Sequence, residues 1–282
     1  MRKKKYLIVS GCSFTTDINF RSDDRPDMDV SWPKWPELLA DKLDMGCINL
    51  ARSGQGNEYI YSTLQDEIYQ YRKKDEIGLV IAAWSQAQRH DYECVSPWLK
   101  KINQANLKWP DNIRSREAEK TCTWRGEPSG QKGDIVYWVR KSLRYFAAFE
   151  MMCERYNIPY LQTQMIQFFS DYINGRIMGQ PEYEDYMKNG WPDEAPQHIP
   201  RFSKEYREIL RMITKYDKIL NTEKFLGWPN VWAFGGMPLN DMVFGPTHSS
   251  WTTHEPWTIS HRDNHPNAAG HEKIAQYIYD TL

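Results

Sequence analysis

The feature that most restricts the fold is a repeated pairing of a short apolar run with a longer amphipathic segment. Leu79–Trp84 (LVIAAW) contains no charged or strongly polar residue, which predicts a strand covered on both faces. Tyr6–Ser10, Cys47–Ala51 and Pro159–Met165 are further strand candidates, and Val231–Phe234 is a weaker fifth. Strands that alternate with helices are typical of a parallel sheet, so the chain is predicted to have an α/β fold.

Five segments have helical spacing of their apolar residues: Trp35–Leu43, a helix that starts at Asn57, Asp134–Tyr156, Ser203–Asn221 and Ala268–Leu282. We expect Asn57 to cap the second of these helices. Two polar, irregular stretches, at about 95–132 and 166–200, are interpreted as insertions into a single domain over residues 1–282. The segment Gly235–Arg262 has no period and predicts a long loop.

The charge balance argues against several classes of partner, and the cysteine content argues against a disulfide-linked fold. Lys and Arg number 36 against 37 Asp and Glu, a net charge of −1, so neither a nucleic-acid nor a membrane partner is expected. The apolar run Tyr6–Val9 is shorter than the ~7 residues of a signal-peptide core. The 5 cysteines are odd in number and lack CxxC spacing, which argues against a disulfide framework. We therefore expect a cytoplasmic protein; its oligomeric state stays open.

Small polar residues follow three of the predicted strands. They are Gly11–Thr15 (GCSFT), Ser53–Asn57 (SGQGN) and Trp84–Gln86 (WSQ), while Asp263–Asn267 (DNHPN) precedes the last predicted helix. Open parallel sheets bind ligands outside the carboxyl ends of their strands. We therefore expect these segments to present hydroxyl, amide and backbone N–H groups to one crevice.

This set of motifs resembles the SGNH (GDSL-like) hydrolase family, and DNHPNAAGHEKIA is similar to that family's last motif. The resemblance covers the ends of the chain and the strand-end motifs, and it skips both insertions. It implies a three-layer α/β/α sandwich with a central parallel sheet of about five strands. It also implies hydrolysis or transfer of an acyl group without a cofactor. The GCSFT, W-S-x-x-x-R and D-x-H-P segments resemble bacteriophage-encoded members, which would place the chain in a host cytoplasm or a virion.

Residue chemistry supports a nucleophile, a base and an acid in these motifs. The Ser13 hydroxyl is a weak nucleophile until a base such as His265 takes its proton. Asp263 is the nearest carboxylate that could orient His265. Taken alone, Ser13 is also explained as a helix cap, and His265 as a surface residue. Cys12 replaces the family's Asp before the serine and is an alternative nucleophile, although buried cysteines are commonly inert.

Other residues are predicted to stabilise the oxyanion or bind substrate. The resemblance implies that the N–H groups of Ser13 and Gly54 are oxyanion donors. The family's third-motif Asn is absent, so Ser85 or Asn57 would have to replace it. The resemblance makes Arg89 the third-motif arginine, either a clamp on a substrate carboxylate or a surface ion-pair residue. Asp263 and His265 are separated by one residue, where two are usual in the family.

The late histidines do not predict a metal site. Five of the seven lie near the end of the chain: His248, His254, His261, His265 and His271. Only His261 and His265 have the ligand spacing of a helix, and Pro266 disfavours a helix there. We expect His271 to have a structural role in the last helix.

The function predicted from these residues is that of a serine esterase or acylhydrolase acting on a small-molecule or carbohydrate ester, such as an O-acetyl group. Three alternatives remain. An O-acyltransferase would use the same nucleophile and base. A non-catalytic structural or host-interaction protein of a phage particle would explain the missing Asn and the aromatic-rich insertions. Nucleotide binding has little support, because neither GxGxxG nor GxxxxGK[ST] is present.

Overall fold

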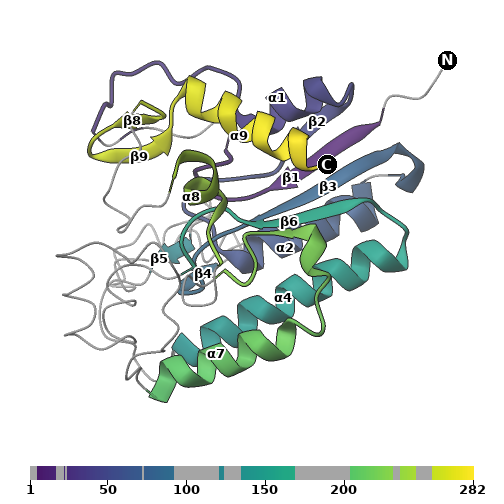
Figure 1. Cartoon of the computed structure of the whole chain (residues 1–282). Coiled ribbons are helices and arrows are strands. Elements are labelled where there is room, and N and C mark those ends of the chain that lie inside the picture. The colour runs from purple at the N-terminus through teal and green to yellow at the C-terminus, as the bar shows by residue number, and fades with distance from the viewer. Residues whose placement is uncertain are drawn as a thin grey trace, which may run out of the picture.

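A parallel five-stranded sheet forms the centre of the protein, in the order β2-β1-β3-β6-β7 (Figure 1). Its strands are β1 (Tyr6–Ser10), β2 (Gly46–Asn49), β3 (Ile77–Trp84), β6 (Tyr160–Gln164) and β7 (Phe225–Leu226). The computed structural model describes residues 5–16, 22, 24–71, 73–91, 121–123, 135–168, 204–230, 236–245 and 256–282. The predicted α/β fold with about five parallel strands is confirmed.

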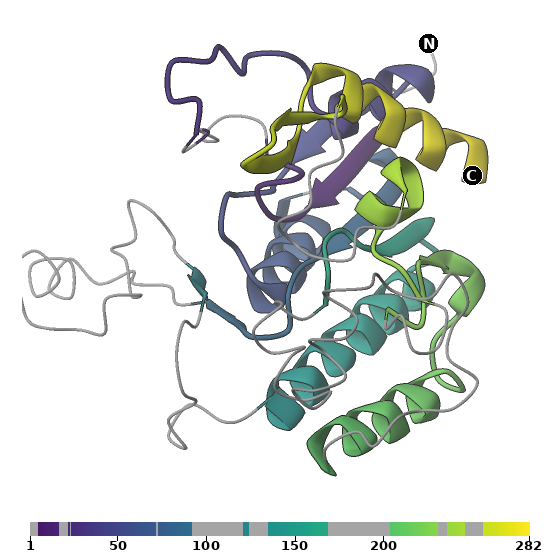
Figure 2. The same cartoon turned by 60° about the vertical axis from the view of Figure 1, so that its left-hand side comes forward.

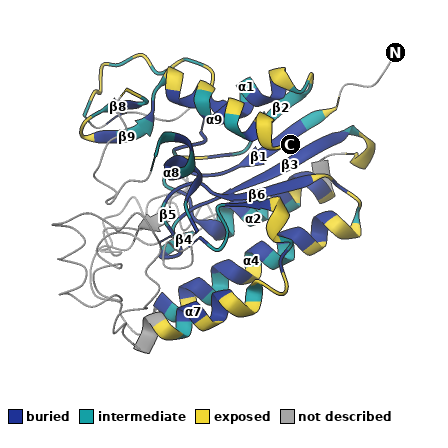
Figure 3. Cartoon of the chain, viewed as in Figure 1, coloured by how far each residue is buried: buried dark blue, intermediate teal, exposed yellow. Residues whose placement is uncertain are grey.

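Helices cover both faces of the sheet. Helices α2 (Asn57–Asp66), α4 (Ile135–Arg155) and α7 (Lys204–Tyr216) lie on one face, and α1 (Trp35–Lys42), α8 (Leu239–Phe244) and α9 (Ala268–Thr281) lie on the other (Figure 1). Figure 3 shows strands that are buried throughout the centre and helices that are exposed only along their outer sides.

The side-chain alternation of the strands divides the core into two clusters. In β3, Val80 and Ala82 pack against α2 and α4, while Leu79 and Ile81 pack against α1 and α9. Successive side chains of a strand point to opposite faces, so a strand covered on both sides must be apolar throughout. Complete burial of each large aliphatic side chain contributes ~1.5–3 kcal/mol. The LVIAAW run therefore had to lie at the centre of the sheet.

The polar strand β6 fits this core because most of its buried amide atoms are hydrogen-bonded; among the described residues, Gln164 Oε1 is the amide atom of this strand without a partner. Gln162 accepts a hydrogen bond from Trp84 Nε1 at 3.0 Å and donates to Glu150 at 3.3 Å. Gln164 donates to the backbone carbonyls of Ser85 at 2.9 Å and Ile166 at 2.8 Å. A buried amide without partners would cost free energy. These bonds instead tie β6 to the end of β3.

The structure corrects several details of the sequence-based prediction. The fifth strand of the sheet is Phe225–Leu226, and the candidate Val231–Phe234 lies outside the described residues. The segment Gly235–Arg262 contains α8 and β8 (Thr258–Ser260), so the expectation of a loop without elements was wrong. The helix expected over Ser203–Asn221 ends at Tyr216.

Short elements complete the described chain: η1 (Glu67–Tyr71), η2 (Lys74–Glu76), β4 (Arg89–Asp91), β5 (Thr121–Thr123), η5 (Thr222–Lys224) and β9 (Asp263–Pro266). Apart from Thr121–Thr123 and residues 166–168, both predicted insertions lie outside the described residues. Within the described ranges, no helix combines the length and the apolar character that crossing a bilayer requires.

The hairpin of β8 and β9 is joined closely to the start of α9. Asn267 caps α9 by accepting a hydrogen bond from the Gly270 N–H at 3.0 Å, and its amide donates to the carbonyls of Pro256 at 2.7 Å and Thr258 at 2.9 Å. A Cβ atom at Gly270 would lie 2.2 Å from the Trp257 carbonyl oxygen. The helix and the hairpin therefore pack backbone against backbone.

We expect Gly270→Ala to lower the free energy of unfolding by about 1–3 kcal/mol, because the added methyl group must push the hairpin away from α9. In an unrestricted helix the same change would stabilise by about 1 kcal/mol. Urea unfolding measures the difference, with the exposed Glu272→Ala on the same helix as a control that stays within about 0.5 kcal/mol of the parent. A Gly270→Ala protein as stable as the parent would contradict this packing.

Candidate active site

Ser13 lies in a tight turn directly after β1. The carbonyl of Cys12 accepts hydrogen bonds from the N–H groups of Thr15 at 2.9 Å and Thr16 at 3.1 Å, which closes the turn. Cys12 and Phe14 are buried in the core on the α1 and α9 side, while Ser13 is partly exposed. The turn therefore places the hydroxyl of Ser13 outside the core and keeps the thiol of Cys12 inside it.

His265 and Asp263 lie on the same side of β9. This strand pairs antiparallel with β8, with Ser260 opposite Asp263 and Thr258 opposite Pro266. Side chains two residues apart in a strand share one face. The single-residue spacing of D-x-H is therefore the spacing that brings both side chains together on a strand.

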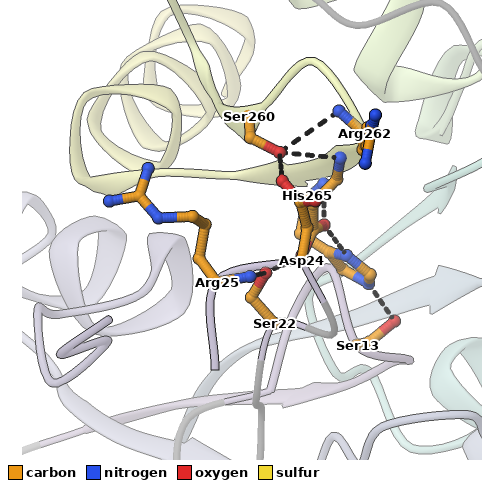
Figure 4. A network of polar contacts seen from close by, with 8 residues as sticks. Ser13, Ser22, Asp24, Arg25, Ser260, Arg262 and His265 are labelled. Atoms are coloured by element: carbon orange, nitrogen blue, oxygen red, sulfur yellow. Dashed lines mark hydrogen bonds and ion pairs between the residues drawn. The ribbon is translucent and has the colours of Figure 1, made fainter. Parts of the chain in front are cut away.

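Ser13, His265 and Asp263 form a continuous chain of hydrogen bonds (Figure 4). His265 Nε2 lies 2.8 Å from Ser13 Oγ, and His265 Nδ1 lies 2.5 Å from Asp263 Oδ1. A carboxylate only accepts, so Nδ1 carries the proton, and Nε2 of the neutral ring is left to accept from the Ser13 hydroxyl. The ring also packs on Phe14, with 4.5 Å between the ring centroids. Figure 2 shows the hairpin beside the segment that follows β1.

The Asp263 carboxylate is buried but well supplied with donors. Its burial raises the pKa, but the hydrogen bonds and charge of His265, together with a hydrogen bond from Ser22, outweigh this and hold the pKa below its ordinary value. The backbone N–H of His265 also donates to Oδ1 at 3.1 Å. Asp263 is therefore a charged acceptor for His265 at neutral pH.

The ends of β1, β2 and β3 are joined at one edge of the sheet. Arg52 N–H donates to the Gly11 carbonyl at 3.2 Å, which brings the loop containing Gly54 beside the Ser13 turn. Gly54 has a φ of 79°, and among the described residues no atom beyond Gly54 and its two chain neighbours lies within 4 Å of the position that a Cβ would occupy. Within the described part of the chain, no protein acceptor takes the N–H of Ser13 or of Gly54. Both donors are thus available to a ligand.

Asn57 connects the second strand-end loop to the end of β3. It is the first residue of α2, and Gly56 is the N-cap, so the expected capping role was wrong. Its amide accepts from the Ser85 N–H at 2.8 Å and donates to the Ser85 carbonyl at 3.2 Å and to Ser142 Oγ at 3.0 Å. Both amide hydrogens are therefore used inside the protein.

The Ser85 hydroxyl and the Arg89 guanidinium differ in their hydrogen bonding. The Ser85 side chain is buried, and its hydroxyl has no hydrogen-bond partner among the described residues. Arg89 donates through Nη1 to the Gln55 carbonyl and through Nε to Gln86 Oε1, both at 3.2 Å. Arg89 therefore supports the loop that contains Gly54, and its role as a substrate clamp stays a prediction.

Residues that the motifs did not indicate complete the surroundings of the site. Ser22 contacts Asp263, and Asp24 contacts Ser260 of the hairpin (Figure 4). Nothing in their sequence neighbourhood distinguishes them from other polar loop residues, because their partners are more than 200 residues away. Their roles could be found only from the folded chain.

The structure assigns no catalytic or metal-binding contact to the other predicted histidines that it describes. Among the described residues, no three His, Cys, Asp or Glu side chains form a group that could hold a metal ion. His248 and His254 lie outside the described residues. His271 is buried between α9 and α1, and its Nδ1 accepts a hydrogen bond from the Trp35 N–H at 3.3 Å.

Comparison with known proteins finds distant similarity to solved structures. No family model matches the chain, and no curated protein matches it significantly. Among solved structures, a protein assigned to the G-D-S-L lipolytic family from Desulfitobacterium hafniense DCB-2 is similar with a TM-score of 0.45 and 12% identity, over 99% of this chain and 100% of that chain. A protein assigned as a GDSL-like lipase from Parabacteroides merdae has a TM-score of 0.40 and 11% identity, over 100% and 96% of the two chains. Neither TM-score reaches 0.5, so neither likeness assigns this chain a family or an activity.

We expect His271 to make stability depend on pH. Burial, together with the positive charge of Lys34 and that of His265 in its protonated form, lowers the pKa of His271 from 6.5 to about 3 in the folded state. The unfolded chain therefore takes up a proton that the folded chain rejects, and stability present above about pH 6.5 is lost as the pH falls.

Urea unfolding between pH 7 and pH 4.5 tests this expectation. The free energy of unfolding should fall less steeply in His271→Gln than in the parent, by at most ~1.4 kcal/mol per pH unit. This window stays above the ordinary Asp pKa of ~3.9, below which the contribution of Asp263 is lost. The exposed His261→Gln should keep the slope of the parent. Equal slopes in parent and His271→Gln would refute the assignment.

Proposed function

We propose that the protein is a serine hydrolase that cleaves an acyl ester. The observation that carries this proposal is the hydrogen-bond chain from Ser13 Oγ through His265 to Asp263, with 2.8 Å and 2.5 Å between the paired atoms. A nucleophile within hydrogen-bond reach of a base, which a carboxylate orients, is the arrangement that activates a serine hydroxyl. The available N–H groups and the partly exposed hydroxyl support the same chemistry.

In the proposed reaction, Ser13 Oγ attacks the ester carbonyl while its proton passes to His265 Nε2. Asp263 stabilises the resulting imidazolium through its contact with Nδ1. The proton then goes to the departing alcohol, and an acyl-enzyme on Ser13 remains. His265 next takes a proton from a water molecule, whose oxygen attacks the acyl carbon. When the bond between that carbon and Ser13 Oγ breaks, His265 returns the proton to Ser13 Oγ, which releases the acid and restores the free serine.

The tetrahedral intermediates need donors for their oxyanion. We propose the N–H groups of Ser13 and Gly54 as two of these, because no described acceptor occupies them. The buried Ser85 hydroxyl is the candidate for the third position. It is preferred to Asn57, whose amide hydrogens are used by Ser85 and Ser142. An oxyanion donor contributes about 3–4 kcal/mol to lowering the barrier.

The proposed substrates are esters of a small acyl group, such as an O-acetyl group on a carbohydrate. Transfer of the acyl group to a sugar hydroxyl uses the same nucleophile and base, so it differs only in what attacks the acyl-enzyme. Product analysis with an added sugar acceptor separates the two reactions: free acetate indicates hydrolysis, and an acetylated sugar indicates transfer.

We expect Ser13→Ala to lose turnover of p-nitrophenyl acetate by a factor of about 10³ or more, together with covalent labelling by a fluorophosphonate probe. The matched control is Cys12→Ala at the neighbouring position, which removes a buried thiol and should leave the labelling intact. Turnover that persists in Ser13→Ala would refute the serine mechanism. A parent protein that neither turns over ester nor reacts with the probe would favour a non-catalytic structural or interaction role.

A further inference from the structure

Ser22 makes a hydrogen bond that the proposed mechanism has not used. Its side chain is 3% exposed, and its hydroxyl contacts Asp263 Oδ2. Because a carboxylate only accepts, the Ser22 hydroxyl is the donor. The oxygen of the same hydroxyl accepts the N–H of Arg25 at 3.0 Å, which fixes the direction of the side chain (Figure 4).

The two oxygens of Asp263 therefore have different partners. Oδ1 faces His265, through its ring at 2.5 Å and its backbone N–H at 3.1 Å. Among the described residues, Ser22 is the only group that donates to Oδ2. A carboxylate bonded on one oxygen alone can rotate about its Cβ–Cγ bond, and such rotation would weaken the bond to His265. A second donor on the other oxygen opposes this rotation.

A second Ser–Asp pair holds the segment of Ser22 on the hairpin. The Ser260 hydroxyl donates to Asp24 Oδ2 at 2.5 Å, and its oxygen accepts the N–H groups of Asp263 at 3.1 Å and Arg262 at 3.2 Å. The two pairs run in opposite directions, from the segment to the hairpin and from the hairpin to the segment. The pair of Asp24 and Ser260 therefore helps to keep Ser22 beside the Asp263 carboxylate.

From this geometry we propose that Ser22 is a positioning residue of the active site, which acts on the reaction through Asp263. The inference rests on the proposed function, because it assigns a role within the same hydrogen-bond chain. Ser22 has no part in binding the ester. Its hydroxyl fixes the plane of the Asp263 carboxylate, and the carboxylate in turn fixes the ring of His265 against Ser13.

The proposal predicts that Ser22→Ala lowers kcat for p-nitrophenyl acetate by about 10- to 100-fold, the loss typical of a hydrogen bond to a charged group. KM should change by less than about 2-fold, because Ser22 does not contact the ester. The rate of labelling by the fluorophosphonate should fall by the same factor as kcat. Ser62→Ala is the matched control, since among the described residues the Ser62 hydroxyl has just one partner, the Glu58 carbonyl within α2; it should keep the parental kcat.

A double-mutant cycle with Asp263→Ala decides whether Ser22 acts through the carboxylate. In the Asp263→Ala background, Ser22→Ala should lower the residual kcat by less than about 2-fold. An unchanged kcat in Ser22→Ala, or the same fractional loss in both backgrounds, would overturn the proposal. If Ser22→Ala does not fold, Ser22→Cys takes its place in the cycle, because a thiol has a similar size and is a weak donor.

The failure of this inference is distinguishable from failure of the proposed function. If Ser13→Ala loses activity and Ser22→Ala does not, only the role of Ser22 is wrong. If Ser13→Ala keeps full activity, the serine mechanism is wrong and the role of Ser22 falls with it.

Discussion

Strands β1 and β3 are buried on both faces, so neither face of the sheet has room for polar chemistry. Polar groups there are buried, and they need hydrogen-bond partners within the protein, as Gln162 has in Trp84 and Glu150. The carboxyl edge of the sheet is the place where the chain leaves this apolar layer, and the Ser13 turn, the Gly54 loop and Ser85 all follow a strand end. The position of the candidate site is thus a consequence of how the core is covered.

His265 and Asp263, the candidate base and acid, are placed at this edge by a separate element. They lie on the β8–β9 hairpin, which is not part of the main sheet, and the hairpin is located by its contacts with α9. Asn267 bonds to both the hairpin and the helix, and Gly270 permits their close approach. His271 then joins α9 to α1 through the Trp35 N–H. The packing of α9 therefore controls the distance between Ser13 and His265.

A buried carboxylate at Asp263 is costly unless its oxygens are hydrogen-bonded. The His265 ring and backbone supply donors to one oxygen, and Ser22 supplies a donor to the other. Removing a donor would therefore leave a buried carboxylate oxygen unpaired, which would destabilise the site as well as change its geometry. This links the segment after the Ser13 turn to the C-terminal hairpin, and it explains why polar loop residues with no motif of their own lie beside the candidate catalytic groups.

The sequence by itself determined the parts of the protein that depend on local pattern. Apolar runs predicted β1 and β3, because a strand that is covered on both faces is apolar. The residue types of Ser13, Asp263 and His265 predicted their chemistry, and the structure places them in hydrogen-bond contact. Only the tertiary structure decided the place of β7, the hairpin that positions His265, the pairing of Asn57 with Ser85, and the contact of Ser22 with Asp263. Apart from the local pairing of β8 with β9, these features depend on hydrogen bonds between segments that are distant in the sequence, and such bonds leave no periodic signal there.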